Sequence, residues 1–189
     1  MRLVLSTRNA HKLHELERML GGTIGLDPLP DEVELPPETG DTFEANALIK
    51  ARAAAHATGR AAIADDSGIE ADALGGRPGV YSARYAGPDA TDEENLAKLR
   101  AEVPPGTGLR YVCVIAHVTP EGAERTFAGE VRGTMAAAPA GSGGFGYDPV
   151  FLAAEDGAGR TMAQLAPEEK DAISHRGRAA RALTAWLAG

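Results

Sequence analysis

Several residue types are scarce in this 189-residue sequence, and each scarcity excludes a class of protein. The single cysteine, Cys113, rules out an internal disulfide and predicts a reducing compartment, the cytoplasm. No run of about 18 apolar residues is present to span a membrane, and the N-terminus turns polar too soon for a signal peptide. The 19 basic residues are outnumbered by 27 acidic ones, and the net charge of −8 argues against wrapping a nucleic-acid polymer.

The signatures of several common sites are also missing. The glycines of a GxxxxGK[ST] phosphate loop are absent, no His/Cys cluster has zinc spacing, and Ser67 lies outside any G-x-S-x-G elbow. Aromatic residues make up only 5% of the chain, so the core must consist mainly of Ala, Leu, Val and Ile. The length suits one large domain or two small lobes.

The most informative stretch is residues 63–87. A short apolar run there predicts a buried strand that ends in two adjacent carboxylates, Asp65 and Asp66. Adjacent residues of an extended chain point to opposite sides, so the two acids should have different roles. Acids at the carboxyl end of a strand are typical of α/β active sites, and oxygen ligands favour Mg²⁺ or Mn²⁺. The alternative is an ordinary strand-ending turn.

A second polar stretch, residues 7–12, follows a predicted strand at residues 2–6. The helix after it should bury Leu13, Leu16 and Leu20 and expose Glu15, Glu17 and Arg18. A strand, a polar turn and a helix can present free backbone N–H groups to an anion. The alternative is a capped turn with solvated side chains.

The next helix should begin at Asp41 as the N-cap, with Glu44 completing a capping box, and run to about Ala57. Lys50 on this helix and Glu38 before it are candidates for phosphate and metal binding. The alternatives are a solvated lysine and a loop acid.

The framework continues with a capping box at Thr91 and Glu94, a strand at residues 109–118, and a hairpin-paired strand at 125–132. The glycine-rich residues 141–149 include Phe145 and Tyr147, which could stack on a nucleobase. One final helix should follow Pro167 and carry a polar group around His175. A glycine linker and a solvated helix face are the respective alternatives.

Six segments of the chain can be compared with known motifs: residues 7–12 (TRNAHK), 38–51 (ETGDTFEANALIKA), 64–69 (ADDSGI), 74–85 (LGGRPGVYSARY), 143–149 (GGFGYDP) and 168–177 (EEKDAISHRG). Together they resemble the family of non-canonical purine nucleoside triphosphate pyrophosphatases, the inosine/xanthosine triphosphatase-like enzymes. The match covers essentially the whole chain. Arg8 is a departure, because bacterial relatives often carry glycine there.

This resemblance implies an α/β fold with a mixed elongated sheet flanked by helices, in a single domain over residues 1–189 with two lobes and a central substrate cleft. It also implies a homodimer and Mg²⁺-dependent hydrolysis of ITP, dITP or XTP to the monophosphate and pyrophosphate, with Mn²⁺ as an alternative metal. By the same resemblance Asp66 would be the general base, and the metal ligands would be Glu38, Asp65 and Asp66. The substrate-binding residues would be Thr7, Arg8, Asn9, Ala10, His11, Lys12, Lys50, Ser67, Phe145, Gly146, Tyr147, Asp148, Lys170, His175 and Arg176.

Two other functions are kept open at this point. One is a nucleotide-binding regulatory module without turnover, which the Asp65–Asp66 pair together with Lys12 and Lys50 argues against. The other is a triphosphate hydrolase that releases orthophosphate or prefers modified pyrimidines, which product analysis would distinguish.

Overall fold

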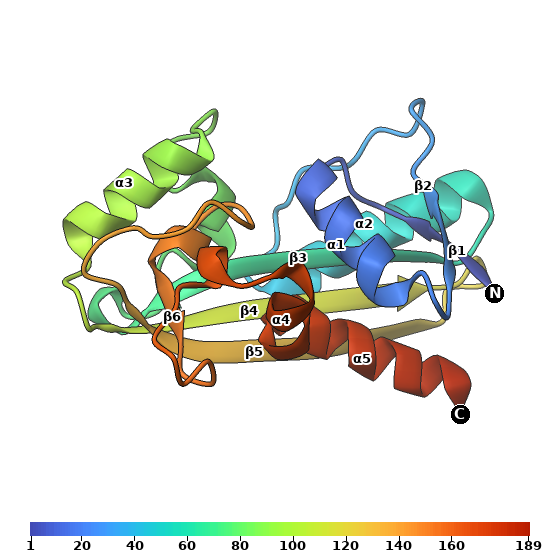
Figure 1. The fold of residues 1–189 in the computed structure, drawn as a ribbon. Coiled ribbons are helices and arrows are strands. Elements are labelled where there is room, and N and C mark those ends of the chain that lie inside the picture. The colour runs from blue at the N-terminus through green and yellow to red at the C-terminus, as the bar shows by residue number, and fades with distance from the viewer. The chain divides into compact units, whose positions relative to one another are not determined.

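Six strands form one mixed sheet in the order β2-β1-β3-β4-β5-β6 (Figure 1). In the computed structural model, which describes residues 1–189, the strands are β1 (Arg2–Leu5), β2 (Gly25–Pro28), β3 (Ala62–Ala71), β4 (Gly108–Val118), β5 (Glu124–Met135) and β6 (Phe151–Ala153). The helices are α1 (Ala10–Leu20), α2 (Phe43–Thr58), α3 (Asp92–Glu102), α4 (Pro167–Ile173) and α5 (His175–Ala188). Strand β1 pairs in parallel with β2 and β3, and β6 pairs antiparallel with β5, so the predicted mixed α/β class is confirmed.

The chain divides into two compact units. The first contains residues 1–66, 113–129 and 176–189, and the second contains residues 67–112 and 130–175. The divisions fall inside β3, β4 and β5, so each of these long strands contributes residues to both units.

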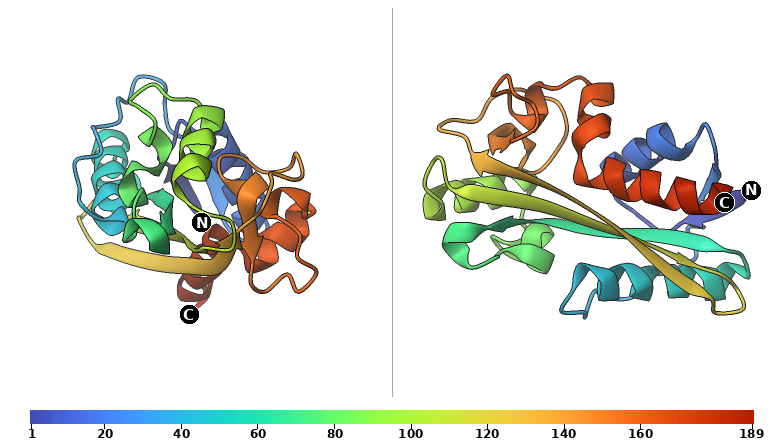
Figure 2. Two further views of the ribbon diagram at one scale, coloured as in Figure 1. Left: turned by 90° about the vertical axis from the view of Figure 1, so that its left-hand side faces the viewer. Right: turned by 90° about the horizontal axis from the view of Figure 1, so that it is seen from below.

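In the first unit, helices α1 and α5 lie on one face of the sheet and α2 lies on the other (Figure 2, right). The α1–α5 face buries Leu16 and Leu20 against Ile63, Ile115 and Leu183. The spacing of the α1 leucines predicts this burial, and Asn9 caps the helix by accepting a hydrogen bond from the Lys12 N–H. Helix α2 instead packs through small residues, Ala47, Ala51 and Ala54, which are fully buried.

The second unit has its own core, built around Leu99, Phe151 and Met162. Helix α3 begins at the predicted capping box, in which the Thr91 side chain and the Glu94 side chain each bond the other residue's backbone N–H. The predicted hairpin of β4 and β5 is confirmed at its turn, where the Thr119 N–H donates to the Ala123 carbonyl.

Strand β3 differs from its prediction in an important way. It does not end at Asp65 and Asp66 but continues to Ala71, because Ile69 and Ala71 supply further buried positions in the second unit. The strand that ends here is the neighbouring β1, whose Leu5 lies opposite Ile63. The two acids therefore lie in the middle of β3, next to the point where the neighbouring strand β1 ends.

Two helix predictions were also wrong in detail. Thr42, rather than Asp41, caps α2 by accepting from the Ala45 N–H, and Glu44 accepts a hydrogen bond from Thr126 instead of closing a capping box. The single helix predicted after Pro167 is two helices, because Ser174 between them has an extended backbone.

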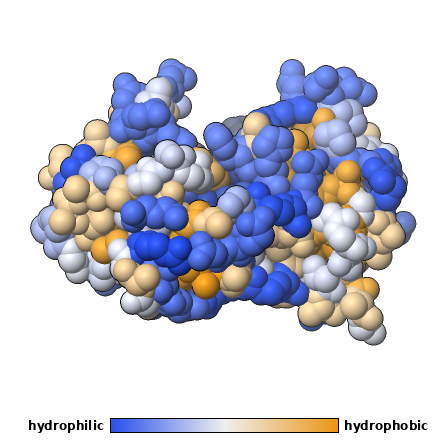
Figure 3. Space-filling model, in the orientation of Figure 1, coloured by the Kyte–Doolittle hydropathy of each residue, from blue (hydrophilic) through white to orange (hydrophobic).

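The surface mixes polar and apolar residues. Figure 3 shows one face, on which hydrophilic residues are interspersed with apolar ones. Met1 and Tyr81 are the exposed large hydrophobic residues. None of the helices combines the length and the apolar character needed to cross a membrane.

Candidate active site

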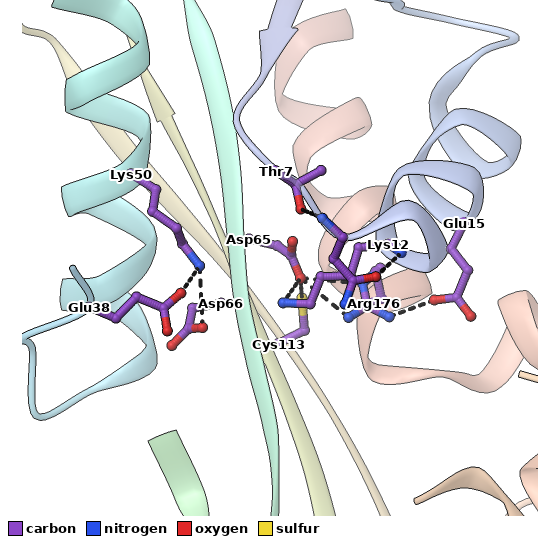
Figure 4. A network of polar contacts seen from close by, with 10 residues as sticks. Thr7, Lys12, Glu15, Glu38, Lys50, Asp65, Asp66, Cys113 and Arg176 are labelled. Carbon is purple, nitrogen blue, oxygen red and sulfur yellow. Dashed lines mark hydrogen bonds and ion pairs between the residues drawn. The ribbon is translucent and has the colours of Figure 1, made fainter. Parts of the chain in front are cut away.

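The centre of the candidate site is the pair Asp65–Asp66 on β3. The two carboxylates project from opposite sides of the strand (Figure 4), as the alternation of side chains along a strand requires. Asp66 points toward α2, and Asp65 points toward α1 and α5. Each acid belongs to a different group of charged residues, although the two are adjacent in sequence.

On the α2 side, Lys50 lies between Asp66 and Glu38. Its Nζ atom is 2.5 Å from a Glu38 carboxylate oxygen and 3.4 Å from Asp66 Oδ1. Burial acts to lower the pKa of Lys50, but the negative charges of Asp66, Asp65 and Glu38 outweigh it and raise the pKa. Lys50 is therefore a buried, fully charged cation and not the solvated lysine of the alternative interpretation.

The surroundings of Asp66 disfavour its ionised form. Burial, together with the charges of Glu38 and Asp65, raises the pKa of its carboxyl group despite the opposing charges of Lys50 and Lys12. Its Oδ2 atom is buried and has no hydrogen-bond partner. A raised pKa and a buried acceptor without a partner are the properties expected of a group that meets a ligand or a proton there.

On the α1–α5 side, Asp65 is held by two cations. Its Oδ2 atom is 3.2 Å from Lys12 Nζ and 3.3 Å from Arg176 Nη2. Burial would raise the pKa of Asp65, but Lys12, Arg176 and Lys50 hold it well below its usual range. Asp65 is therefore a permanently ionised anchor within the first unit.

Arg176 also binds Glu15 on α1, with Nη1 2.5 Å from the carboxylate, and both side chains are buried. The prediction that Glu15 faces outward was wrong, because its charge is neutralised by a partner 161 positions away. Lys12, one turn earlier on α1, is the local signal that this helix face carries charge as well as leucines.

Cys113 lies at the bottom of this group, with its sulfur 4.0 Å from Asp65 Oδ2. Burial, followed by the charge of Asp65, raises the pKa of the thiol to about 12. The thiol is therefore inert core, as predicted from its position in the strand.

Two polar side chains of the loop before α1 form hydrogen bonds with the protein's own backbone. Thr7 Oγ1 accepts a hydrogen bond from the Asn9 N–H, which fixes the turn that precedes the helix. Arg8 turns away to the loop after β2, where its guanidinium donates to the carbonyls of Leu29, Pro30 and Val33 at 2.7–2.9 Å. Arg8 thus supports that loop, while Ala10 and His11 form the exposed first turn of α1.

A divalent metal fits the α2 side of this site. No three His, Cys, Asp or Glu side chains of the structure are grouped to hold a metal alone. Mg²⁺ commonly uses only one or two carboxylates and completes its shell with water and phosphate oxygens. Glu38 and Asp66, which share Lys50, provide such a pair, and the unpartnered Asp66 Oδ2 is an available oxygen ligand. Asp65 lies on the other side of β3 with its own cations.

A separate polar group is found in the second unit around Asp148. Its Oδ2 atom accepts from Lys170 Nζ at 2.6 Å and from the Phe145 N–H at 3.0 Å. Lys170 also lies 5.3 Å from the centre of the Phe145 ring. A Cβ atom at Gly144, whose φ is +68°, would lie 2.0 Å from Asp148 Oδ2, so glycine is required for this close approach.

The remaining predicted residues of this unit differ in exposure. Phe145 is partly exposed, whereas Tyr147 is buried and its hydroxyl donates to the Ser82 carbonyl at 2.7 Å, which favours Phe145 for stacking. The Gly146 N–H donates to Asp92. The imidazole of His175 stacks on Tyr111, with ring centres 4.6 Å apart. Ser67 follows Asp66 along β3 and is partly exposed.

Comparison with known proteins decides the family. The family model described as the Ham1 family matches residues 3–186. The chain belongs to the Ham1 family. The resemblance read from the six sequence segments is confirmed.

Two relatives and one solved structure show how similar the chain is to known proteins over nearly its full length. The chain is 54% identical to a dITP/XTP pyrophosphatase of Symbiobacterium thermophilum, covering 94% of this chain and 90% of that one. It is 53% identical to a dITP/XTP pyrophosphatase of Frankia alni, covering 99% and 97%. Among solved structures, a Ham1 protein of Coxiella burnetii is similar with a TM-score of 0.88 and 41% identity, covering 100% of this chain and 98% of that one.

The buried charges around Arg176 predict a large loss of stability when that residue is removed. Arg176→Met should lower the free energy of unfolding by about 3–5 kcal/mol, because the buried carboxylates of Asp65 and Glu15 lose their shared cation. Chemical denaturation measures the change.

The control is Arg52→Met, which removes an exposed ion pair to Glu124 in the same unit and should cost less than about 1 kcal/mol. Equal losses in the two variants would contradict the assignment of Arg176 as a buried counter-ion.

Proposed function

We propose that this protein hydrolyses non-canonical purine nucleoside triphosphates, ITP, dITP and XTP, to the monophosphate and pyrophosphate, and so cleanses the nucleotide pool. The observation that carries the proposal is Asp66, a buried carboxylate with a raised pKa beside Lys50 and Glu38, in a chain whose relatives are dITP/XTP pyrophosphatases.

The first unit is proposed to hold the triphosphate. Lys12 and Lys50 supply positive charge on the two sides of β3, and the first turn of α1, after Thr7 and Asn9, offers backbone N–H donors to phosphate oxygens. Phosphoryl transfer depends mainly on positioning and on charge neutralisation, which these groups provide. The exposed residues Arg8, Ala10 and His11 border the same turn.

Asp66 is proposed to act as the general base. It takes a proton from the attacking water as the bond between the α- and β-phosphates is broken, and its raised pKa makes it a stronger acceptor than an ordinary aspartate. A divalent cation, with Mg²⁺ first and Mn²⁺ second, would be held by Glu38 and Asp66, with Asp65 behind the strand. When bound, it supplies charge neutralisation to the phosphates.

The second unit is proposed to hold the nucleoside. Phe145 offers a partly exposed ring, and Ser67, Gly146, Tyr147, Asp148, Lys170 and His175 complete the predicted set, with Arg176 of the first unit following in sequence. Inosine and xanthine carry a 6-oxo group that accepts a hydrogen bond from a donor such as His175. Guanine adds a 2-amino group, which costs about 1–3 kcal/mol if it is left unpaired in a dry pocket.

Product analysis tests the reaction. Wild-type protein with Mg²⁺ should release pyrophosphate from ITP and XTP and turn over GTP and ATP poorly. Asp66→Asn should lower kcat by about 10²–10⁴-fold because the base is lost. The measurement is product-resolved hydrolysis of the four nucleotides.

The matched control is Asp41→Asn, an exposed aspartate in the loop that carries Glu38, which should leave kcat unchanged. Orthophosphate as the sole product, or equal use of all four nucleotides, would overturn the substrate class. An unaffected Asp66→Asn would move the base elsewhere.

A cytoplasmic homodimer is also proposed. The buried, unpaired Cys113 suits a reducing compartment. For the dimer, support comes from Tyr81, which is 56% exposed and packs on the Arg84 guanidinium at 5.1 Å. Tyrosine and arginine are the residue types enriched at protein interfaces.

Light scattering after gel filtration should give twice the 19.6 kDa chain mass for wild type. Tyr81→Glu should shift the protein toward the monomer, because a charge without a partner is costly at an interface core. Ala182→Glu, at an exposed position of α5, adds the same single negative charge and serves as the control. A monomeric wild type would contradict the dimer without affecting the proposed reaction.

A further inference from the structure

One tyrosine in the second unit touches two of the groups proposed to read the nucleobase. Tyr111 on β4 lies in a column of rings, with its ring centre 4.5 Å from that of Phe151 and 4.6 Å from that of His175. The His175 ring is nearly parallel to it, at 9°. The Tyr111 hydroxyl donates to Asp148 Oδ1 at 3.2 Å. Tyr111 itself is buried.

The two oxygens of Asp148 receive different donors. Oδ2 accepts from Lys170 Nζ and from the Phe145 N–H, whereas Oδ1 accepts from Tyr111. Because donors approach both oxygens, the plane of the carboxylate is fixed. The hydroxyl also occupies acceptor capacity on Oδ1 that a ligand amino group could otherwise use.

The ring of Tyr111 has a second effect, which is independent of the hydroxyl. Stacking on a nearly parallel neighbour restricts the orientation of the His175 imidazole, and hence the direction in which its N–H groups can donate. An imidazole of fixed orientation can discriminate a 6-oxo group from a 6-amino group better than a freely rotating one.

We propose that Tyr111 is a positioning residue for base preference, acting on guanine rejection through its hydroxyl and on adenine rejection through its ring. This rests on the proposed function, in which Asp148 and His175 face the nucleoside. The hydroxyl denies the guanine 2-amino group an acceptor on Asp148. The ring keeps His175 directed at the 6-oxo group that adenine lacks.

Two substitutions separate these effects. Tyr111→Phe keeps the ring and removes the hydroxyl, so the ratio of kcat/KM for ITP over GTP should fall about threefold to tenfold, the worth of one hydrogen bond. The ratio for ITP over ATP should stay unchanged. Tyr111→Leu removes the ring as well, so the ratio for ITP over ATP should also fall.

The control is Tyr85→Phe, which removes another tyrosine hydroxyl that donates to a carboxylate, Glu102, within the same unit. Both ratios should equal those of wild type. Thermal midpoints of all variants separate a loss of packing from a change of preference, since a purely structural role would lower the midpoint and leave both ratios intact.

The outcomes are distinct. A fall of the ITP-over-GTP ratio in Tyr111→Phe supports the proposal, and unchanged ratios in a folded variant overturn it. If Tyr111→Leu does not fold, the Tyr111→Phe result decides. If wild type releases no pyrophosphate from ITP, the proposed function fails instead. Dissociation constants of IMP and GMP, measured by calorimetry on the same proteins, then still test whether Tyr111 sets base preference.

Discussion

The structure of the candidate site depends on one constraint, the opposite orientation of two adjacent carboxylates on a continuous strand. Asp65 and Asp66 cannot share one environment, because neighbouring side chains of a strand face opposite sides. Each buried negative charge therefore needs its own cations: Lys12 and Arg176 for Asp65, and Lys50 for Asp66. The cations come from α1, α5 and α2, so the helices that cover each face of the first unit also supply the positive charge needed on that face.

The charges on the two sides of β3 are neutralised to different degrees, and this difference gives Asp65 and Asp66 different chemistry. Lys12 and Arg176 hold the pKa of Asp65 down against burial, whereas burial raises the pKa of Asp66, which shares Lys50 with Glu38. A carboxylate with excess positive charge around it is a structural anchor. A carboxylate with too little can gain from a proton or a divalent cation, which is the property that the proposed hydrolysis requires.

Local patterns predicted much of the framework. The leucines of α1 and the Thr91–Glu94 capping box depend on residues within one or two turns of a helix, and both were confirmed. The Ham1 family was likewise recognisable, because its six segments keep their order and spacing. The predictions that were wrong concern residues whose partners are far away in the sequence. Glu15 is buried only because Arg176 neutralises it, and β3 continues past Asp66 only because the second unit provides a core for Ile69.

The free energy of unfolding is the most direct test of the different roles of the two aspartates. Asp65→Asn and Asp66→Asn should be compared by chemical denaturation at neutral pH without metal. We expect a loss of about 3–5 kcal/mol for Asp65→Asn, because the buried Arg176 then keeps only Glu15 and the partly buried Lys12 loses its carboxylate partner. For Asp66→Asn we expect a change of less than about 1 kcal/mol, or a gain, because Glu38 still neutralises Lys50 and a buried oxygen without a partner loses its charge. Equal losses, or a greater loss in Asp66→Asn, would show that the two aspartates do not differ in this way.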